Sequence, residues 1–176
     1  YQGWNPATAP TLGSPNADGV YEGYINFPAG GTFEFKLNPQ PDWSNSYGDG
    51  GAGTLSTTGG NLTVPGAGYY RIRANTNTNT WSANATTCSM IGDFNGWSAD
   101  AAMTYNTGDK VWTGTITVPS NSGFMFRANN DWGLNLGDNG ADGSLEPDGA
   151  NINITAGTHT ITLFLNNAGY FTYKIQ

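Results

Sequence analysis

The chain contains the same strand-like stretch twice. Residues 111–127 read VWTGTITVPSNSGFMFR, and residues 20–36 read VYEGYINFPAGGTFEFK. In each copy apolar and polar residues alternate with a period of two, and a turn rich in Pro, Gly or Asn leads into a Phe-x-Phe segment that ends on a basic residue. This pattern predicts paired antiparallel strands that bury one face against a second sheet, which is a β-sandwich.

The repeat extends over the whole sequence. Other matching motifs also lie about 90 residues apart, a spacing that suits a small domain better than a solenoid repeat. They are Gln2-Gly3-Trp4 with Asn95-Gly96-Trp97, Asp42-Trp43 with Asp131-Trp132, Tyr47-Gly48-Asp49 with Leu136-Gly137-Asp138, and Asn61–Val64 with Asn151–Ile154. We therefore expect an all-β protein of two tandem antiparallel β-sandwich domains, Ig-like or starch-binding-module-like, at residues 1–85 and 86–176.

The composition narrows the class of ligand. The 176 residues include 26 Gly and 9 Pro, only 11% are charged, and the formal net charge is −7. A weakly charged, acidic surface argues against nucleic acid or an anionic membrane as a partner. It suits a neutral, hydrogen-bonding ligand such as a sugar polymer. The one cysteine, Cys88, allows no disulfide within the chain, and we expect it to begin a strand as a small apolar residue.

Four tryptophans recur at matching places in the two copies. Trp4 and Trp97 follow glycines in loops, and we expect Trp43 and Trp132, which follow aspartates among Asn, Ser and Gly, to lie in loops as well. Each ring either plugs one end of its own sandwich or forms an exposed platform on which the apolar face of a pyranose can stack. The second pair has no apolar neighbours, and this favours exposure, since large exposed aromatic residues usually mark a binding surface.

A basic residue recurs beside each pair of tryptophans. Lys36 and Arg127 lie on the polar phase of their strands, and the chain has only six Lys and Arg residues. A long cationic donor between two indole rings can hydrogen-bond vicinal sugar hydroxyls. The neighbouring Asn and Asp side chains can add donors and acceptors. The candidate binding residues are Trp4, Lys36, Trp43 and Asn45 in the first copy, and Trp97, Arg127, Asn130 and Trp132 in the second.

Taken together, these motifs resemble the C-terminal carbohydrate-binding domains of the SusE/SusF family, and the opening residues 1–10 resemble the SusE branch in particular. Members are outer-membrane lipoproteins of Bacteroides-type starch-utilisation systems. The resemblance implies surface-exposed modules that bind starch or maltooligosaccharides without cleaving them, through two aromatic residues and one Lys or Arg per site. It also implies other outer-membrane components of such a system as partners. The family's N-terminal Ig-like domain and lipid-anchor cysteine are not in this sequence, and the first copy looks clipped.

Other readings remain open at this point. The tandem sandwiches could be structural or adhesion spacers with buried tryptophans, or they could bind a different glycan. Residues 138–143 (DNGADG) offer oxygen ligands for calcium but lack the spacing of an EF-hand loop. The recurring aspartates lie in turn contexts, which are poor places to raise the pKa of a catalytic acid. We expect no catalytic residue, no metal, no cofactor, no nucleic-acid partner and a monomeric chain.

Overall fold

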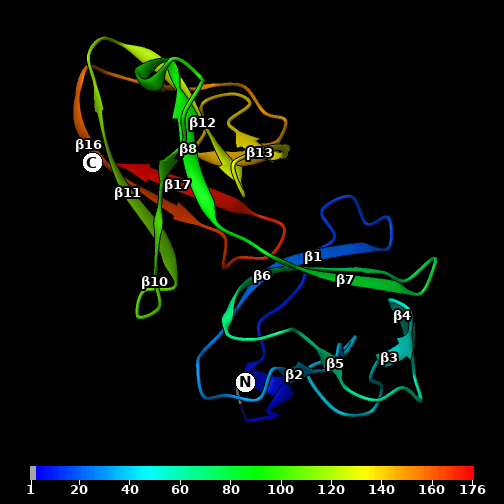
Figure 1. Ribbon diagram of the computed structural model, residues 1–176. Coiled ribbons are helices and arrows are strands. Elements are labelled where there is room, and N and C mark those ends of the chain that lie inside the picture. The colour runs from blue at the N-terminus through cyan, green and yellow to red at the C-terminus, as the bar shows by residue number, and fades with distance from the viewer. Residues whose placement is uncertain (1–2) are drawn as a thin grey trace. The chain divides into compact units, whose positions relative to one another are not determined.

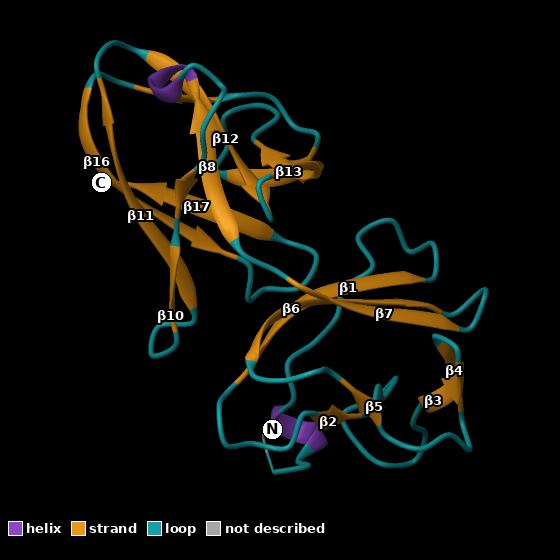
Figure 2. Ribbon diagram, viewed as in Figure 1, coloured by secondary structure: helices purple, strands orange, loops and turns teal. Residues whose placement is uncertain are grey.

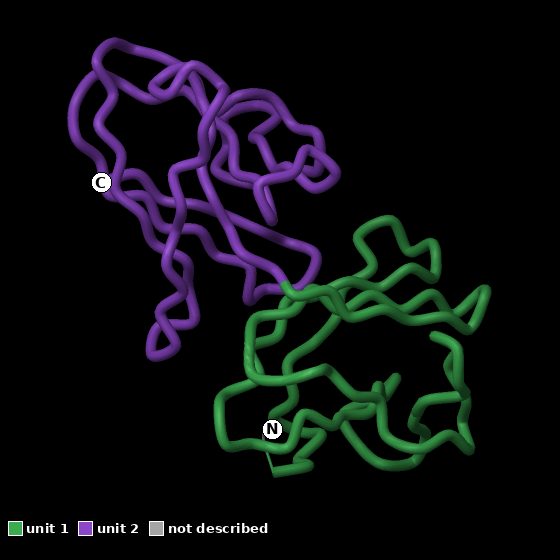
Figure 3. The backbone as a smooth tube through the Cα atoms, viewed as in Figure 1, with its two compact units in different colours: residues 1–85 green, residues 86–176 purple. Residues whose placement is uncertain are grey.

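The computed structural model describes residues 3–176 (Figure 1). Tyr1 and Gln2, which belong to the opening motif, lie outside the described residues. The structure is nearly all β, with two short 3-10 turns, η1 (Pro6–Thr8) and η2 (Asp93–Asn95) (Figure 2). The prediction of an all-β sandwich fold is confirmed. The chain divides into two compact units, residues 1–85 and 86–176 (Figure 3).

The first unit has one long sheet and one strand pair. Its strands are β1 (Val20–Phe27), β2 (Glu34–Phe35), β3 (Gly48–Gly51), β4 (Thr54–Ser56), β5 (Leu62–Thr63), β6 (Gly68–Asn75) and β7 (Thr80–Ala85). The sheet has the order β1-β6-β7-β4-β3, and β2 pairs with β5. The core lies between them, built from residues such as Phe27, Phe35, Leu62 and Ile72.

The second unit is a single continuous sheet that folds over on itself. Its strands are β8 (Cys88–Gly92), β9 (Ala101–Ala102), β10 (Thr104–Asn106), β11 (Val111–Val118), β12 (Ser122–Ala128), β13 (Asp131–Gly137), β14 (Ser144–Pro147), β15 (Ile152–Ile154), β16 (Gly157–Phe164) and β17 (Phe171–Ile175). The order is β10-β11-β16-β17-β14-β13-β12-β8-β9, with β15 also paired to β12. β14 pairs with β13 on one side and with β17 on the other, so it connects the two layers.

The strand alternation follows the sequence pattern where one face is open to solvent. In β11, Ile116 and Val118 are buried while Thr115 and Thr117 are exposed. In β12 the pattern breaks because Met125 is buried along with the phenylalanines on either side of it. β12 pairs with β8 on one edge and with β13 and β15 on the other, so it is a central strand.

One local expectation is wrong. The Asp131-Trp132 motif was expected in a loop, but it begins strand β13. Asn129 and Asn130 both have positive φ angles, 54° and 55°. Two consecutive left-handed residues are the signature of a tight hairpin turn, and asparagine tolerates that conformation. The chain therefore re-enters the sheet at once. Among residues 3–176, the helices are far too short to cross a bilayer.

Candidate functional site

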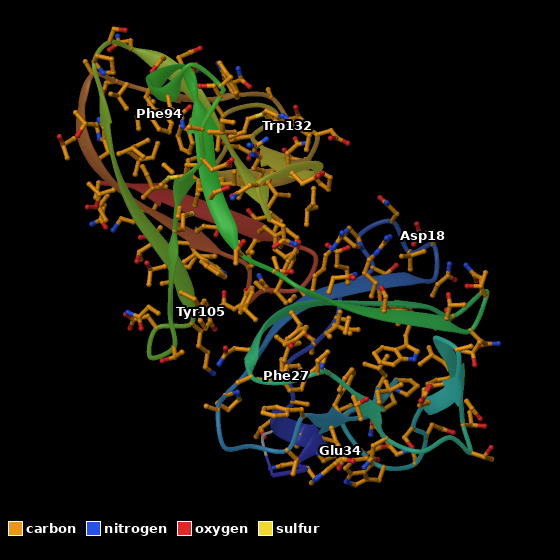
Figure 4. The ribbon with its side chains drawn as sticks, in the orientation of Figure 1. Asp18, Phe27, Glu34, Phe94, Tyr105 and Trp132 are labelled. Atoms are coloured by element: carbon orange, nitrogen blue, oxygen red, sulfur yellow. The ribbon has the colours of Figure 1, made fainter. Side chains whose placement is uncertain are left out.

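The two recurring tryptophans of the second unit lie against each other. The ring centroids of Trp97 and Trp132 are 6.2 Å apart, and the ring planes differ by 28°. Trp132 is 47% exposed on the β12–β13 hairpin (Figure 4), and Trp97 is half-buried. Because the distance lies in the range of contacting aromatic rings, the pair forms one continuous apolar surface.

Trp97 is held in place by the turn that contains it. Gly96 and Trp97 have φ angles of 64° and 56°, a left-handed turn that glycine favours at its first position. The indole N–H donates to Asp93 Oδ1 at 2.7 Å, and Asp93 Oδ2 accepts from the Gly123 N–H at 2.8 Å. These two bonds, the backbone one foremost, lower the pKa of Asp93. The Trp97 ring is therefore fixed by a carboxylate that is itself tied to the next loop.

Arg127 is fixed between an acid and an indole. Its Nε donates to Asp100 Oδ1 at 2.6 Å and its second terminal nitrogen donates to Oδ2, while the carbon of the guanidinium lies 4.8 Å from the centre of the Trp132 ring. Both side chains of the ion pair are only 10% exposed. The Arg127 hydrogen bonds hold the pKa of Asp100 below its usual value, and the Ser89 hydroxyl adds a further bond at 2.6 Å. Of the five N–H groups on a guanidinium, two are engaged by Asp100.

The first unit brings the matching residues together in a similar way. Trp4 and Trp43 have ring centroids 6.2 Å apart with planes inclined at 39°, and they are 38% and 50% exposed. Gly3 and Trp4 repeat the left-handed turn, with φ angles of 73° and 58°. Trp4, Lys36 and Trp43 all line one cavity of about 580 Å³.

The cation is held differently in this unit. Lys36 Nζ donates to the carbonyl oxygens of Gly59 at 2.8 Å and Gly60 at 3.3 Å. Residues 3–17, which include the Gly3-Trp4 turn and the segment after it, contain no aspartate or glutamate, so the lysine has no counterpart of Asp100 to pair with. An ammonium has three donors, so one N–H is not engaged by these two carbonyls.

The remaining candidate residues lie in or next to the segments that carry Trp43 and Trp132. Asn45 and Asn130 are both exposed, one beyond Trp43 and one in the turn before Trp132. Asp42 Oδ1 accepts from the Ser44 N–H at 2.8 Å, and Asp131 Oδ1 accepts from the Gly133 N–H at 2.6 Å. Both aspartates therefore stabilise their own turns.

The fold of this chain is similar to that of a protein of known structure. The crystal structure of SusF from Bacteroides thetaiotaomicron is similar to this chain with a TM-score of 0.58 at 21% identity, over 94% of this chain and 42% of that one. The chain is SusF-like in fold. A family model described as Carbohydrate-binding module 48 (Isoamylase N-terminal domain) matches residues 66–142, and one described as Domain of unknown function (DUF5111) matches residues 3–86. No curated protein matches the sequence.

Residues 138–143, the candidate calcium loop, form hydrogen bonds within the loop itself. Asp138 accepts the N–H groups of Asp142 at 3.1 Å and Gly143 at 3.0 Å, and the Tyr173 hydroxyl at 2.8 Å. Burial alone would raise the pKa of Asp138, but these hydrogen bonds together lower it. Residues 3–176 contain no group of three acidic, His or Cys side chains placed to share a metal ion.

Two residues that organise the second site were missed from sequence. Asp100 positions Arg127, and Asp93 positions Trp97. Asp93 lies two residues before the recurring Asn95-Gly96-Trp97 motif, and an acidic residue so close to a tryptophan is a signal for a partner of the indole N–H. Asp100 has no acidic counterpart in the first copy, so comparing the two copies hides it.

Proposed function

We propose that this chain binds carbohydrate without cleaving it, at one site in each unit, and that the ligand is starch-like α-1,4-glucan. One observation carries the proposal: each unit has a pair of contacting, partly exposed tryptophans, with Arg127 against Trp132 in the second unit and Lys36 lining the same cavity as Trp4 and Trp43 in the first. The match to a carbohydrate-binding-module family and the fold shared with SusF support a sugar ligand.

The tilt of the rings favours a curved glucan. Stacking a pyranose on an indole buries apolar C–H surface while its equatorial hydroxyls stay in water. Successive glucose rings of an α-1,4-linked chain turn with the helix of the polymer. Indole planes inclined at 39° and 28° follow such a turn, whereas a flat β-1,4-linked chain calls for coplanar rings.

The cations add hydrogen-bond donors that orient the sugar on an otherwise apolar surface. The guanidinium of Arg127 is clamped by Asp100 on one side and packs on Trp132, so its remaining N–H groups have a fixed position at the edge of the platform. Donors fixed in this way lose little entropy when they bond to a pair of sugar hydroxyls. Lys36 places a single positive charge on the wall of the cavity that Trp4 and Trp43 also line.

The acidic groups near the second site support binding rather than hydrolysis. A glycosidase needs two carboxyl groups across the scissile bond, one of them protonated at working pH. Asp93 and Asp100 both have lowered pKa values, and both accept hydrogen bonds that keep them ionised. Neither is suited to donate a proton to a leaving group.

Two sites on one chain raise the affinity for a polymer above that for a short oligosaccharide, because the second binding event becomes intramolecular. We propose that the sites act at the outer surface of a bacterial cell, as the family resemblance implies, where retention of a long polysaccharide is useful. A longer ligand should therefore bind more tightly than maltooligosaccharide at equal glucose concentration.

Affinity electrophoresis against a panel of polysaccharides tests binding and ligand class together. The wild-type chain should be retarded by amylopectin and not by a soluble cellulose derivative. Trp132→Ala should weaken binding of the second site about 30-fold, as expected for loss of a central aromatic anchor worth about 2 kcal/mol. Trp43→Ala should do the same for the first site, and the double variant should lose retardation.

Tyr170→Ala is the matched control, because Tyr170 is 57% exposed and lies in neither set of site residues. It should bind as the wild type does. Equal retardation of wild type and double variant contradicts the proposal, and so does an equal loss of thermal stability and binding in Trp132→Ala, since that result indicates a packing role. Release of new reducing ends from starch would contradict the non-catalytic assignment.

A further inference from the structure

The first unit has a cavity that is lined by its own hydrophobic core. The volume is about 580 Å³, and the lining includes Phe27, Phe35 and Ile72, all of them buried. Phe27 comes from the long sheet and Glu34 from the β2–β5 pair on the other side of the core (Figure 4). Protein interiors are normally close-packed, whereas pockets for small molecules measure about 300–1,000 Å³. A cavity of this size is therefore a candidate ligand site.

The cavity extends along strand β1. Tyr21, Ile25 and Phe27 share one face of this strand, and all three line the cavity. Tyr21 and Phe27 lie six positions apart, which corresponds to about 20 Å at the rise of a strand. Ile72 and Ala74 of the neighbouring strand β6 line the same space, and Ala74 pairs directly with Tyr21. A space of this length suits a linear chain better than a compact ring.

The deep part of the cavity is apolar. Its lining there consists of core side chains such as Ile25, Phe35 and Leu55. Among residues 3–176, the buried side-chain N and O atoms without a hydrogen bond all belong to residues outside this lining. A sugar ring placed inside would lose the hydrogen bonds of its hydroxyls to water and find few replacements. An alkyl chain would instead gain free energy by leaving water, and apolar cavities of this kind bind apolar molecules.

The charges on the lining cancel. Among the described residues that line the cavity, the charged ones are Glu34 and Lys36, which have opposite signs. Lys36 Nζ donates to the carbonyl oxygens of Gly59 and Gly60, and Glu34 Oε2 accepts from Asn61 Nδ2 at 3.3 Å. A wall without net charge gives no electrostatic preference for a carboxylate or a phosphate. The polar part of a ligand at this site is therefore expected to be neutral.

The tryptophan pair of the first unit lines the same cavity. Trp4 and Trp43 are both exposed, and their rings contact each other. The lining therefore passes from two exposed indoles to fully buried side chains such as Phe27. A neutral sugar can stack on the indoles, as the function proposed above requires, and an apolar chain can fill the deep part. Because both surfaces belong to one cavity, the two groups can be parts of one molecule.

We propose that the first unit binds a neutral glycoside that carries a linear alkyl or acyl chain, with the sugar on Trp4 and Trp43 and the chain in the cavity along β1. The sugar half of this ligand rests on the function proposed above, whereas the chain half rests on the cavity. The two halves make different demands on an experiment. Stacking of the sugar depends on the indoles, and binding of the chain depends on its length, because each methylene that enters the cavity leaves water.

Calorimetric titration with a series of alkyl maltosides tests the chain half. The full chain carries Trp132→Ala to weaken the second site, and each maltoside is used below its critical micelle concentration. The dissociation constant should fall about fourfold for each methylene added from hexyl to nonyl maltoside, as expected when a CH₂ group moves from water into an apolar site. The heat-capacity change of binding should become more negative along the series, which is the mark of apolar burial. Maltose itself reports on the sugar half.

Two matched substitutions locate the chain. Ala74 is buried and lines the cavity, so Ala74→Leu fills part of the space; it should abolish the dependence on chain length and leave the affinity for maltose unchanged. Ala83→Leu is the control, because Ala83 packs against the same core without lining the cavity, and it should keep the dependence. Nuclear Overhauser effects between the nonyl chain and the methyl groups of Ile25 and Ile72 give a readout that needs no core variant. We expect them in the wild-type chain.

The two halves of the proposal fail in different ways. If hexyl and nonyl maltoside bind equally and no Overhauser effect reaches Ile25 or Ile72, the chain site is wrong, whether or not maltose binds. If the dependence on chain length persists in Ala74→Leu and those Overhauser effects are absent, the chain lies elsewhere and its assignment to the cavity is overturned. If the dependence is found but Trp43→Ala leaves the affinity for every maltoside unchanged, the chain site stands. In that case the sugar half is wrong, and with it the function proposed for the first unit.

Discussion

Replacing Asp100 with alanine should destabilise the second unit and loosen its sugar site at the same time. The carboxylate accepts three hydrogen bonds, two from Arg127 and one from the Ser89 hydroxyl. In Asp100→Ala the guanidinium keeps its position over Trp132 only through the ring contact. Ser89 retains its weaker bond to the Arg127 carbonyl at 3.2 Å. The variant also makes the second unit resemble the first, which has no acidic residue in the segment after its Gly3-Trp4 turn.

The expected magnitude follows from how far the pair is withdrawn from water. Exposed ion pairs contribute about 0–1 kcal/mol, whereas breaking a fully buried pair costs about 3–5 kcal/mol. Both side chains here are 10% exposed, nearer to the buried limit but open at one edge. We expect a loss of about 2–3 kcal/mol in the unfolding free energy of the second unit. Because Arg127 becomes free to move, affinity of the second site for maltooligosaccharide should fall about fivefold.

The pH dependence gives a sharper check than the loss itself. The folded-state pKa of Asp100 is lower than its ordinary value of about 3.9, because Arg127 stabilises the charged form. Stability from this group is therefore complete above pH 4 and is lost as pH falls through the lower, folded-state pKa. The difference between wild type and Asp100→Ala should be full at pH 7 and should shrink below pH 4.

Differential scanning calorimetry and urea unfolding measure the effect, with the transition of the first unit as an internal reference. Asp109→Ala is the control, since that exposed aspartate bonds only to nearby Asn106 and its loss should change stability by less than about 0.5 kcal/mol. A stability difference at pH 7 no larger than that of the control refutes the reasoning. A difference that persists unchanged at pH 2 refutes the assignment to the carboxylate.

Two further expectations concern groups outside the sugar sites. Burial and Asp138 raise the pKa of Tyr173 to about 12, so in an ultraviolet pH scan this phenol should ionise at higher pH than an exposed tyrosine. The stability linked to this shift should be present below pH 10 and lost as pH rises toward 12. Tyr173→Phe should lower the unfolding free energy by about 1 kcal/mol and remove that pH dependence. Burial raises the pKa of the Cys88 thiol to about 12, so it should not react with a thiol reagent at pH 8 until urea unfolds the second unit, and fast labelling of the native chain would contradict its burial.

Much of the fold was predictable because a strand with one buried and one exposed face alternates apolar and polar residues along the sequence. β11 alternates between apolar residues and threonines, and its inner positions are buried as expected. The alternation fails at Met125, which is buried although it lies on the face opposite the buried Phe124 and Phe126, so both faces of β12 are covered there. Sequence periodicity indicates whether one face of a strand is exposed to solvent, but it does not indicate where in the sheet the strand lies.

The contact between the two tryptophans of each unit was predictable from the sequence but its geometry was not, and their role in binding sugar stays a prediction. The recurrence of two tryptophans and one cation per copy was enough to name the candidates that lie together. The tilt between rings depends on left-handed turns at Gly3-Trp4 and Gly96-Trp97, and no periodic pattern encodes an angle. Asp100 was not identified from the sequence because it occurs in one copy alone, and comparing the two copies identifies only residues that both contain.

The difference between the two cations implies two kinds of binding site built on one scaffold. Arg127 is held by a bidentate carboxylate and an indole, so the N–H groups that Asp100 does not engage are pre-positioned, and in the proposed site they should select a particular pair of hydroxyls. Lys36 donates to two backbone carbonyls and lines a cavity of about 580 Å³. A site with a rigid donor selects geometry, whereas a site with a flexible donor tolerates variation in the chain it meets. For a polymer that presents many local conformations, we expect the proposed first site, with Lys36, to favour capture and the proposed second site, with the clamped Arg127, to favour retention.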